Sequence, residues 1–242
     1  TMKPFTVSAA LESKKFTIRS KLDTSPGYLR VGRKAIRDHK DYGVIDLATV
    51  ISKSSNVGAS KIALALTGPV VRDMFQRVGL GQTTGTGFPG EGAGRLPSPG
   101  RWSPIRVATM SYGYGVSVTA LQLAQAYAVL AGKGSKMPIS LLKLNVPAVG
   151  EQAMPGWVAD EVVKMLHKVV LKGGTGRRAR VMNYRVAGKT GTVHDVGKYG
   201  YEGGRYRALF AGMAPLSSPR VVMVVVIDDP KGGEYYGGEV AA

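Results

Sequence analysis

Three groups of polar residues, far apart in the sequence, carry side chains that could act together in proton transfer. Ser54-Ser55-Asn56 lies in the first quarter of the chain, Lys189-Thr190-Gly191-Thr192 lies in a strand-like stretch, and Lys3 stands close to the beginning. A lysine can act as a general base when burial or a neighbouring positive charge lowers its pKa. The hydroxyl of Ser54 could then pass a proton between that base and a leaving group.

The other polar side chains of these groups suit a peptide substrate that ends in a carboxylate. Asn56 offers both a donor and acceptors to a peptide amide. Lys189 supplies positive charge, and the hydroxyls of Thr190 and Thr192 can hydrogen-bond a carboxylate, while Gly191 leaves room for a backbone at the strand edge. Taken alone, Ser-x-Asn is more often a helix cap and Lys-Thr-Gly-Thr more often an exposed strand end. Their order and structural context therefore matter more than any one group.

Helices are expected around two of the three groups. Pro4 suits a first helical turn, and Asp46 and Thr119 are expected to cap helices that follow them. The expected helices span residues 5–11, 47–52, 57–66, 69–78, 119–130 and 158–171. Ser54-Ser55-Asn56 falls at the junction of the second and third helices, where its side chains can replace broken backbone hydrogen bonds.

The end of the chain changes from helical to strand-like patterns. Three successive strands are predicted, over residues 184–193, 206–214 and 220–228. Residues 215–219 are expected to form a tight connection between the last two strands, which favours antiparallel pairing. Residues 23–39 are expected to be loop and short strand, and residues 79–100 are expected to form a long surface loop. Helices first and adjacent strands last predict an α+β fold, an antiparallel sheet covered by helices.

Composition limits the chemistry that the chain can perform. Its 242 residues fit one domain, and the absence of cysteine excludes disulfides, thiolate catalysis and Cys-ligated metals. The three histidines, His39, His167 and His194, show no metal-ligand spacing, so neither a metal nor a cofactor is expected. The glycine-rich stretch 173–176 lacks the end of a phosphate-binding loop.

The net charge of +17 indicates which partners the protein could attract, and it does not indicate the fold. Arg177, Arg178 and Arg180 form the one dense basic cluster and have no accompanying aromatic motif, so a nucleic-acid partner is not expected. A polyanionic wall or an anionic membrane would also attract such a chain. The longest strongly apolar run, residues 221–227, is far shorter than the ~20 residues of a spanning helix, and no signal peptide is recognisable. A membrane anchor is expected to lie outside these residues.

Further segments give the pattern a family context. They are residues 1–5 (TMKPF), 53–58 (KSSNVG), 87–91 (GFPGE), 111–115 (SYGYG), 209–213 (LFAGM) and 235–238 (YYGG). With the three polar groups they span essentially the whole chain, which resembles the transpeptidase domain of division-specific class B penicillin-binding proteins, the septal peptidoglycan transpeptidases. The resemblance implies the penicillin-binding protein and serine β-lactamase fold. It also implies a nucleophilic serine immediately before Thr1, which would complete the motif S-x-x-K.

The resemblance assigns roles to the polar groups. It implies that Lys3 is the general base, Ser54 the proton relay and Asn56 a contact to the substrate amide. The carboxylate of a D-Ala-D-Ala stem peptide or of a β-lactam would be held by the side chains of the strand motif, namely Lys189, Thr190 and Thr192. The Thr192 N–H would form an oxyanion hole with the N–H of the serine.

Aromatic residues are expected at the edge of the same site. In the resembled family the second tyrosine of the 111–115 segment borders the site, which favours Tyr114 over Tyr112, although core packing is an open alternative for both. Tyr235 and Tyr236 would form an aromatic wall for bulky ligands. His194 stands where relatives often carry arginine, so it could make a pH-dependent carboxylate contact.

The resemblance also implies a cellular setting. Residues 1–242 would form a transpeptidase domain truncated at both ends, without the N-terminal anchor and pedestal domain and without the C-terminal helix that covers the sheet. The whole protein would work at the periplasmic face of the bacterial inner membrane. Its expected partners are peptidoglycan stem peptides as donor and amine acceptor, β-lactam antibiotics and membrane proteins of the division machinery, with no nucleic acid.

Alternatives share parts of this pattern. A D,D-carboxypeptidase would use water as the acceptor, and a serine β-lactamase would need a dedicated group for rapid deacylation. Glu91 lies in a Gly-Pro loop and is not a convincing candidate for that group. If the residue before Thr1 were not serine, the chain would be a non-catalytic scaffold of the division machinery.

Overall fold

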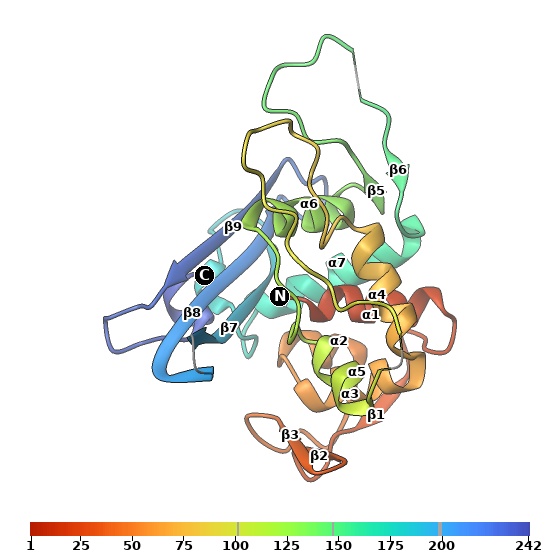
Figure 1. Cartoon of the computed structure of the whole chain (residues 1–242), viewed down its shortest axis with the longest axis vertical. Coiled ribbons are helices and arrows are strands. Elements are labelled where there is room, and N and C mark those ends of the chain that lie inside the picture. Colours follow the sequence, from red (N-terminus) through yellow and green to blue (C-terminus); the bar gives the residue numbers. More distant parts are fainter. Residues whose placement is uncertain (101, 147, 198–199) are drawn as a thin grey trace.

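A helical body packs against one face of a three-stranded antiparallel sheet in the computed structural model, which describes residues 1–100, 102–146, 148–197 and 200–242 (Figure 1). The helices are α1 (Lys3–Glu12), α2 (Leu47–Ser52), α3 (Asn56–Leu66), α4 (Gly68–Arg77), α5 (Pro104–Met110), α6 (Ala120–Ala131), α7 (Gly156–Val170) and α8 (Gly237–Val240). The strands are β1 (Lys21–Asp23), β2 (Tyr28–Val31), β3 (Lys34–Arg37), β4 (Val44–Asp46), β5 (Ser135–Lys136), β6 (Glu151–Gln152), β7 (Ala187–Gly197), β8 (Gly200–Ala214) and β9 (Val221–Asp228).

Helix α1 lies at the centre of the helical body. Every residue from Lys3 to Leu11 is buried, because small or apolar side chains occupy nearly all faces of the helix. The ring of Phe5 meets that of Tyr127 edge to face, with 5.5 Å between ring centroids, which joins α1 to α6. A helix enclosed in this way holds its first residue, Lys3, in a fixed place.

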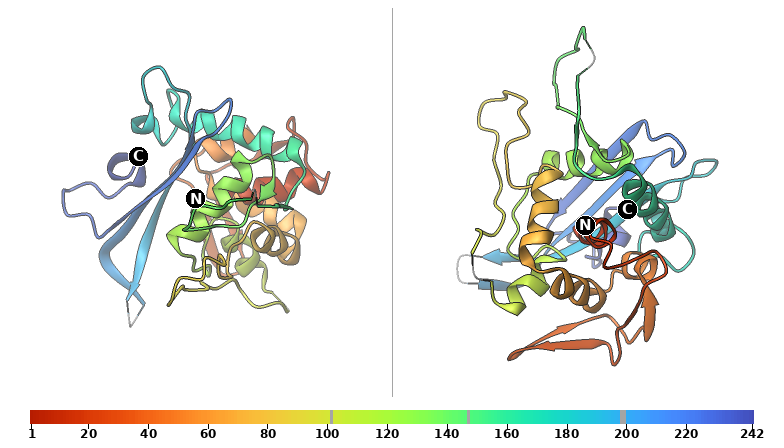
Figure 2. Two further views of the ribbon diagram at one scale, coloured as in Figure 1. Left: turned by 90° about the horizontal axis from the view of Figure 1, so that it is seen from above. Right: turned by 90° about the vertical axis from the view of Figure 1, so that its right-hand side faces the viewer.

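The three-stranded sheet has the order β7-β8-β9, with antiparallel neighbours. Thr192 pairs with Ala208, and Ala208 with Ile227. Side chains alternate between the two faces, so Val222 and Val224 of β9 contribute to the main core while Val225 and Ile227 join a second cluster near α8. Helices α6 and α7 cover the face that adjoins the main core (Figure 2).

The α+β class, the antiparallel sheet and the six expected helices are confirmed. Asp46 caps α2 by accepting the Thr49 N–H at 2.7 Å, and Thr119 caps α6 within a reciprocal capping box with Gln122. The tight connection between β8 and β9 is also present.

Several expectations need correction. The strand expected over 184–193 begins at Ala187, because the preceding residues leave the sheet and expose Tyr184. Residues 23–39 hold the complete β2–β3 hairpin and not just one short strand. Helix α5 and the small β1–β4 and β5–β6 sheets were not expected. The 79–100 loop is not wholly at the surface, because Leu80 and Leu96 are buried in the core.

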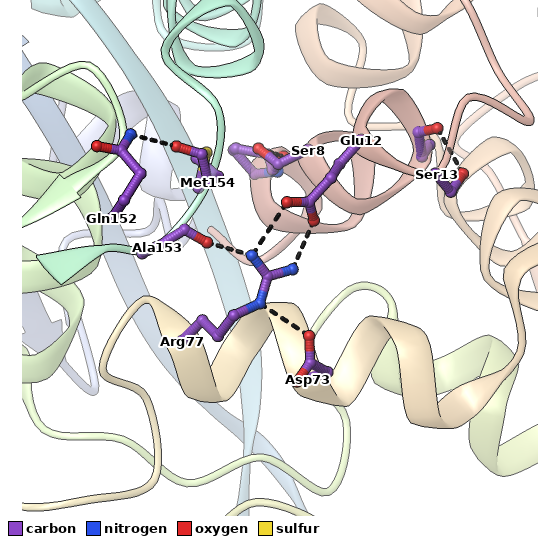
Figure 3. A network of polar contacts seen from close by, with 10 residues as sticks. Ser8, Glu12, Ser13, Asp73, Arg77, Gln152, Ala153 and Met154 are labelled. Atoms are coloured by element: carbon purple, nitrogen blue, oxygen red, sulfur yellow. Dashed lines mark hydrogen bonds and ion pairs between the residues drawn. The ribbon is translucent and has the colours of Figure 1, made fainter.

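An arginine network joins the far end of α1 to its neighbours (Figure 3). The guanidinium of Arg77, on α4, donates to both carboxylate oxygens of Glu12, to the carboxylate of Asp73 and to the carbonyl of Ala153. The Glu12 contact is bidentate and only about a third of each side chain is exposed, with 33% for Arg77 and 28% for Glu12. Arg77 therefore fixes the end of α1 opposite Lys3.

Replacing Arg77 tests this anchoring. We expect Arg77→Met to lower the free energy of unfolding by about 1–2 kcal/mol, because Glu12 and the Ala153 carbonyl lose their partner. For a domain of this size that is a fall of a few degrees in melting temperature. Lys164→Met is the control, because it removes an exposed ion pair with Glu161 and should leave the melting temperature almost unchanged. Equal effects of the two substitutions would contradict the anchoring role.

Candidate active site

The structure brings Lys3 and Ser54 together across 51 positions of sequence. Lys3 is the first residue of α1, and Ser54 lies in the turn between α2 and α3. The Nζ of Lys3 lies 2.9 Å from the Oγ of Ser54, which is hydrogen-bonding distance. Ser54 has a φ of +58°, a left-handed conformation that is unfavourable for serine by about 1–2 kcal/mol. The fold therefore holds this hydroxyl against the lysine in a strained turn.

Asp38, which the sequence did not single out, holds that turn in place. Its carboxylate accepts hydrogen bonds from the Ser55 hydroxyl and from the backbone N–H groups of Asn56 and Val57. Ser55 in turn caps α3 by accepting the Gly58 N–H at 2.8 Å. A carboxylate at a helix N-terminus accepts hydrogen bonds from free backbone N–H groups, and its negative charge is stabilised by the positive end of the helix dipole. No local pattern marks Asp38, because it lies 18 positions before Asn56.

Burial lowers the pKa of both lysines of the site. Lys3 is only 7% exposed, and burial lowers its pKa to about 8, while the negative charge of Asp38 acts in the opposite direction. Lys189 is fully buried, and burial, followed by the charge of Lys3, lowers its pKa well below the ordinary value. A pKa of about 8 leaves roughly a tenth of Lys3 neutral at pH 7. Lys3 can therefore act as a base near neutral pH.

The Lys-Thr-Gly-Thr motif forms the inner end of β7. Lys189 Nζ donates to the backbone oxygen of Thr190 at 3.1 Å, so the ammonium lies behind the strand. Thr190 is also buried, and its hydroxyl lies 2.9 Å from that of Thr175. Thr192 is exposed, and its hydroxyl accepts the Gly237 N–H at 3.0 Å. Since that bond uses Thr192 as an acceptor, its hydroxyl proton is available for a ligand.

Gly191 has a packing role that the sequence did not reveal. A Cβ at this position would lie 3.2 Å from the Thr1 side chain, which is closer than most Cβ contacts. The glycine therefore allows β7 to approach the residue that enters α1. The carbonyl of Thr1 also accepts the Tyr127 hydroxyl at 3.0 Å. Thr1 is thus held between β7 and α6, beside Lys3.

Tyr112 lies closer to the base than the expected Tyr114. The Nζ of Lys3 is 5.6 Å from the centre of the Tyr112 ring, in a cation–π arrangement. Tyr114 is 43% exposed and meets the Tyr112 ring at 5.5 Å. Tyr112 therefore contacts the catalytic candidate directly, and Tyr114 lies outside it.

Four aromatic rings lie in a row beside the exposed end of the motif. We call this row the aromatic stack, although among its neighbouring pairs Tyr206 and Tyr235 alone are nearly parallel. His194 lies 4.4 Å from Tyr206, Tyr206 stacks on Tyr235 at 4.0 Å, and Tyr235 lies 4.5 Å from Tyr236. Tyr206, on β8, was not among the expected site residues. Tyr236 directly precedes Gly237, which bonds to Thr192, so this aromatic stack borders the strand motif.

The side chain of Asn56 is hydrogen-bonded to the last residue of β3. Its side-chain Nδ2 donates to the Arg37 carbonyl at 3.2 Å, which leaves its oxygen as an acceptor. Two surface hollows lie elsewhere, one beside Arg77 and one beside His167, and neither is lined by Lys3, Ser54 or Lys189. The contacts among these side chains therefore mark the site.

The described residues contain neither a metal-binding cluster of side chains nor a helix that could span a membrane. Across residues 1–100, 102–146, 148–197 and 200–242, no group of three or more His, Asp or Glu side chains is arranged to hold a metal ion. In the same ranges, no helix combines the length and apolar character needed to cross a bilayer.

Comparisons with known proteins give the family of the chain. The family described as the penicillin binding protein transpeptidase domain matches residues 1–242. The peptidoglycan D,D-transpeptidase FtsI of Escherichia coli K12 is 43% identical over 242 residues, all of this chain and 41% of that protein. The probable peptidoglycan D,D-transpeptidase PbpC of Pseudomonas aeruginosa is 42% identical over 241 residues, 100% of this chain and 43% of that protein. The chain thus spans about two fifths of the length of these curated relatives.

A solved structure shares the fold. The apo structure of the TP domain from Burkholderia pseudomallei penicillin-binding protein 3 superposes with a TM-score of 0.93 at 42% identity. The match covers 98% of this chain and 72% of that chain.

Direct titration of Lys3 tests the electrostatics of the site. We expect the NMR resonances of its side chain to report a pKa of about 8. Asp38→Asn should lower that pKa further, because it removes the charge that favours the ammonium form. Asp41→Asn is the matched control, an exposed carboxylate three positions away, and should change the value less. A Lys3 pKa near the ordinary lysine value of about 10.4 would contradict the assignment.

Proposed function

The chain belongs to the family of penicillin-binding protein transpeptidase domains, and we propose that it is the catalytic part of a peptidoglycan D,D-transpeptidase. The observation that carries the proposal is the 2.9 Å contact between a buried Lys3 and Ser54, beside the Lys-Thr-Gly-Thr strand. The nucleophile would be a serine immediately before Thr1, one helical turn from Lys3. The position of Thr1, held next to Lys3 and Gly191, supports this geometry.

The reaction would proceed through an acyl-enzyme. Neutral Lys3 takes the proton of the serine hydroxyl as the serine oxygen attacks the carbonyl carbon of the D-Ala-D-Ala bond. The proton passes through the Ser54 hydroxyl to the nitrogen of the terminal D-alanine, which leaves, and an ester remains. An amine of a second stem peptide then attacks the ester and gives a proton to Lys3. The serine oxygen departs and regains its proton, which completes the cross-link.

Substrate binding would use the strand side of the site. The terminal carboxylate would accept a hydrogen bond from the Thr192 hydroxyl, with the Thr190 hydroxyl nearby. Lys189 lies behind the strand, where a bound carboxylate would favour its ammonium form. The Thr192 N–H and the N–H of the serine would stabilise the oxyanion. Asn56 would hold the substrate amide. Within the aromatic stack, His194, Tyr235 and Tyr236 would contact bulky groups of a β-lactam, with Tyr114 at the outer edge.

One observation argues against a serine β-lactamase. Glu91 accepts hydrogen bonds from the Thr84 N–H and from the hydroxyls of Thr84 and Thr86. Its carboxylate oxygens are therefore engaged in hydrogen bonds within their own loop. This does not suit a base for rapid deacylation. With Glu91 held in this way, we expect slow hydrolysis of the penicillin-bound enzyme.

The setting of the whole protein is also a proposal. The relatives are named as peptidoglycan transpeptidases, so we infer a bacterial protein anchored at the periplasmic face of the inner membrane. Membrane proteins of the division machinery would be its partners. The charge of +17 suits work beside an anionic cell wall.

Intact-mass measurement of the full-length protein with benzylpenicillin tests the proposed function. We expect a stable gain equal to the whole drug, located on the serine before Thr1. Ser54→Ala should slow acylation by roughly 10²–10⁴-fold, because the proton relay is lost. Ser13→Ala removes an exposed hydroxyl at the other end of α1 and should leave the rate unchanged. An unmodified protein with intact drug would refute the proposal, and an unmodified protein with hydrolysed drug would indicate a β-lactamase.

A further inference from the structure

The β2–β3 hairpin carries a concentration of unpaired positive charge. It spans residues 28–37, turns at Gly32 with a φ of +60°, and projects from the helical body (Figure 2). Its basic side chains are all exposed, namely Arg30, Arg33, Lys34 and Arg37. Within the described part of the chain, none of these four forms an ion pair. The hairpin itself contains no acidic residue.

The hairpin has one face toward the body and one toward solvent. Leu29 pairs with Ile36, which is buried, so that face packs inward. Tyr28 pairs with Arg37 on the opposite face, where the guanidinium of Arg37 lies 5.6 Å from the centre of the Tyr28 ring. Arg30 shares this face, because strand side chains alternate. The outer face therefore presents the guanidinium groups of Arg30 and Arg37 to solvent, and Arg33 is exposed in the adjoining turn. Guanidinium groups bind carboxylates through paired hydrogen bonds.

The hairpin is tied directly to the candidate active site. The carbonyl of Arg37 accepts the side-chain N–H of Asn56 at 3.2 Å. The next residue, Asp38, caps the turn that holds Ser54. The hairpin therefore has a fixed position relative to the helical flank of the site, next to Asn56 and the Ser54 turn.

We propose that the outer face of the hairpin binds the carboxylates of the peptidoglycan peptide that supplies the acceptor amine. This inference rests on the proposed function. The proposed function places the carboxylate of the donor peptide at β7. The positive charge of the hairpin is then free for the carboxylates of the acceptor peptide. An anionic lipid surface would meet the same charge. Leu29 and Ile36 face inward, however, so Tyr28, 38% exposed, is the large apolar side chain that the outer face offers to a bilayer, which is little for insertion.

The test compares two acceptors in the full-length protein. One is the peptide γ-D-Glu-L-Lys with free carboxylates, and the other is its diamide, which keeps the same amine. We expect the wild type to show a lower acceptor KM for the free acid. Arg30→Gln/Arg33→Gln should reduce that preference by about tenfold, and added salt should reduce it in the wild type. The control Lys172→Gln/Arg220→Gln removes two exposed charges outside the hairpin and should keep the preference.

The outcomes separate this inference from the proposed function. Benzylpenicillin should acylate both double variants at the wild-type rate, since Arg30 and Arg33 are outside the catalytic groups. Failure of the wild type to be acylated would refute the proposed function itself. Normal acylation with an unchanged acceptor preference in Arg30→Gln/Arg33→Gln would overturn only the hairpin proposal. Loss of binding to phosphatidylglycerol vesicles in that variant, with the acceptor preference intact, would assign the hairpin to lipid instead.

Discussion

The burial of Lys3 beside the hydroxyl of Ser54 is the contact on which the rest of the site depends. A lysine exposed to water is an ammonium at neutral pH, and an ammonium cannot accept a proton. The protein removes Lys3 from water at the start of an enclosed helix, and this burial lowers its pKa. Asp38 opposes the effect of burial and keeps the pKa of Lys3 near 8 and not lower. The site is therefore a balance between desolvation and one carboxylate.

Contacts from several parts of the fold keep Lys3, the Ser54 turn and the motif strand in place. Helix α1 is packed on all sides, and Arg77 secures its far end, so Lys3 cannot move without disturbing the core. Asp38 links the β2–β3 hairpin to the Ser54 turn, and Gly191 lets the motif strand approach Thr1 closely. Each flank of the site is thus fixed by a different part of the sequence, and a substrate would meet preformed groups.

Local sequence patterns predicted much of this structure. The caps Asp46 and Thr119, the helical periods and the three terminal strands have short-range signals, and the fold class follows from their order. The three polar groups were recognisable for the same reason. Asp38 and Tyr206 were not, because each acts through residues distant in the sequence. Tyr112 was considered but ranked below Tyr114, because its contact with Lys3 is also distant in the sequence. The depth of Lys189 was also missed, since strand alternation does not reveal what packs over each face.

The pH dependence of the acylation rate of the full-length protein tests the central claim most directly. If neutral Lys3 is the base, the second-order rate constant for benzylpenicillin should rise with pH, pass through an inflection at about 8 and then level off. The rise has this direction because deprotonation creates the active form of the lysine. A rate constant that stays flat between pH 7 and 9, or that climbs toward the ordinary lysine pKa of about 10.4 without an inflection near 8, would contradict the account.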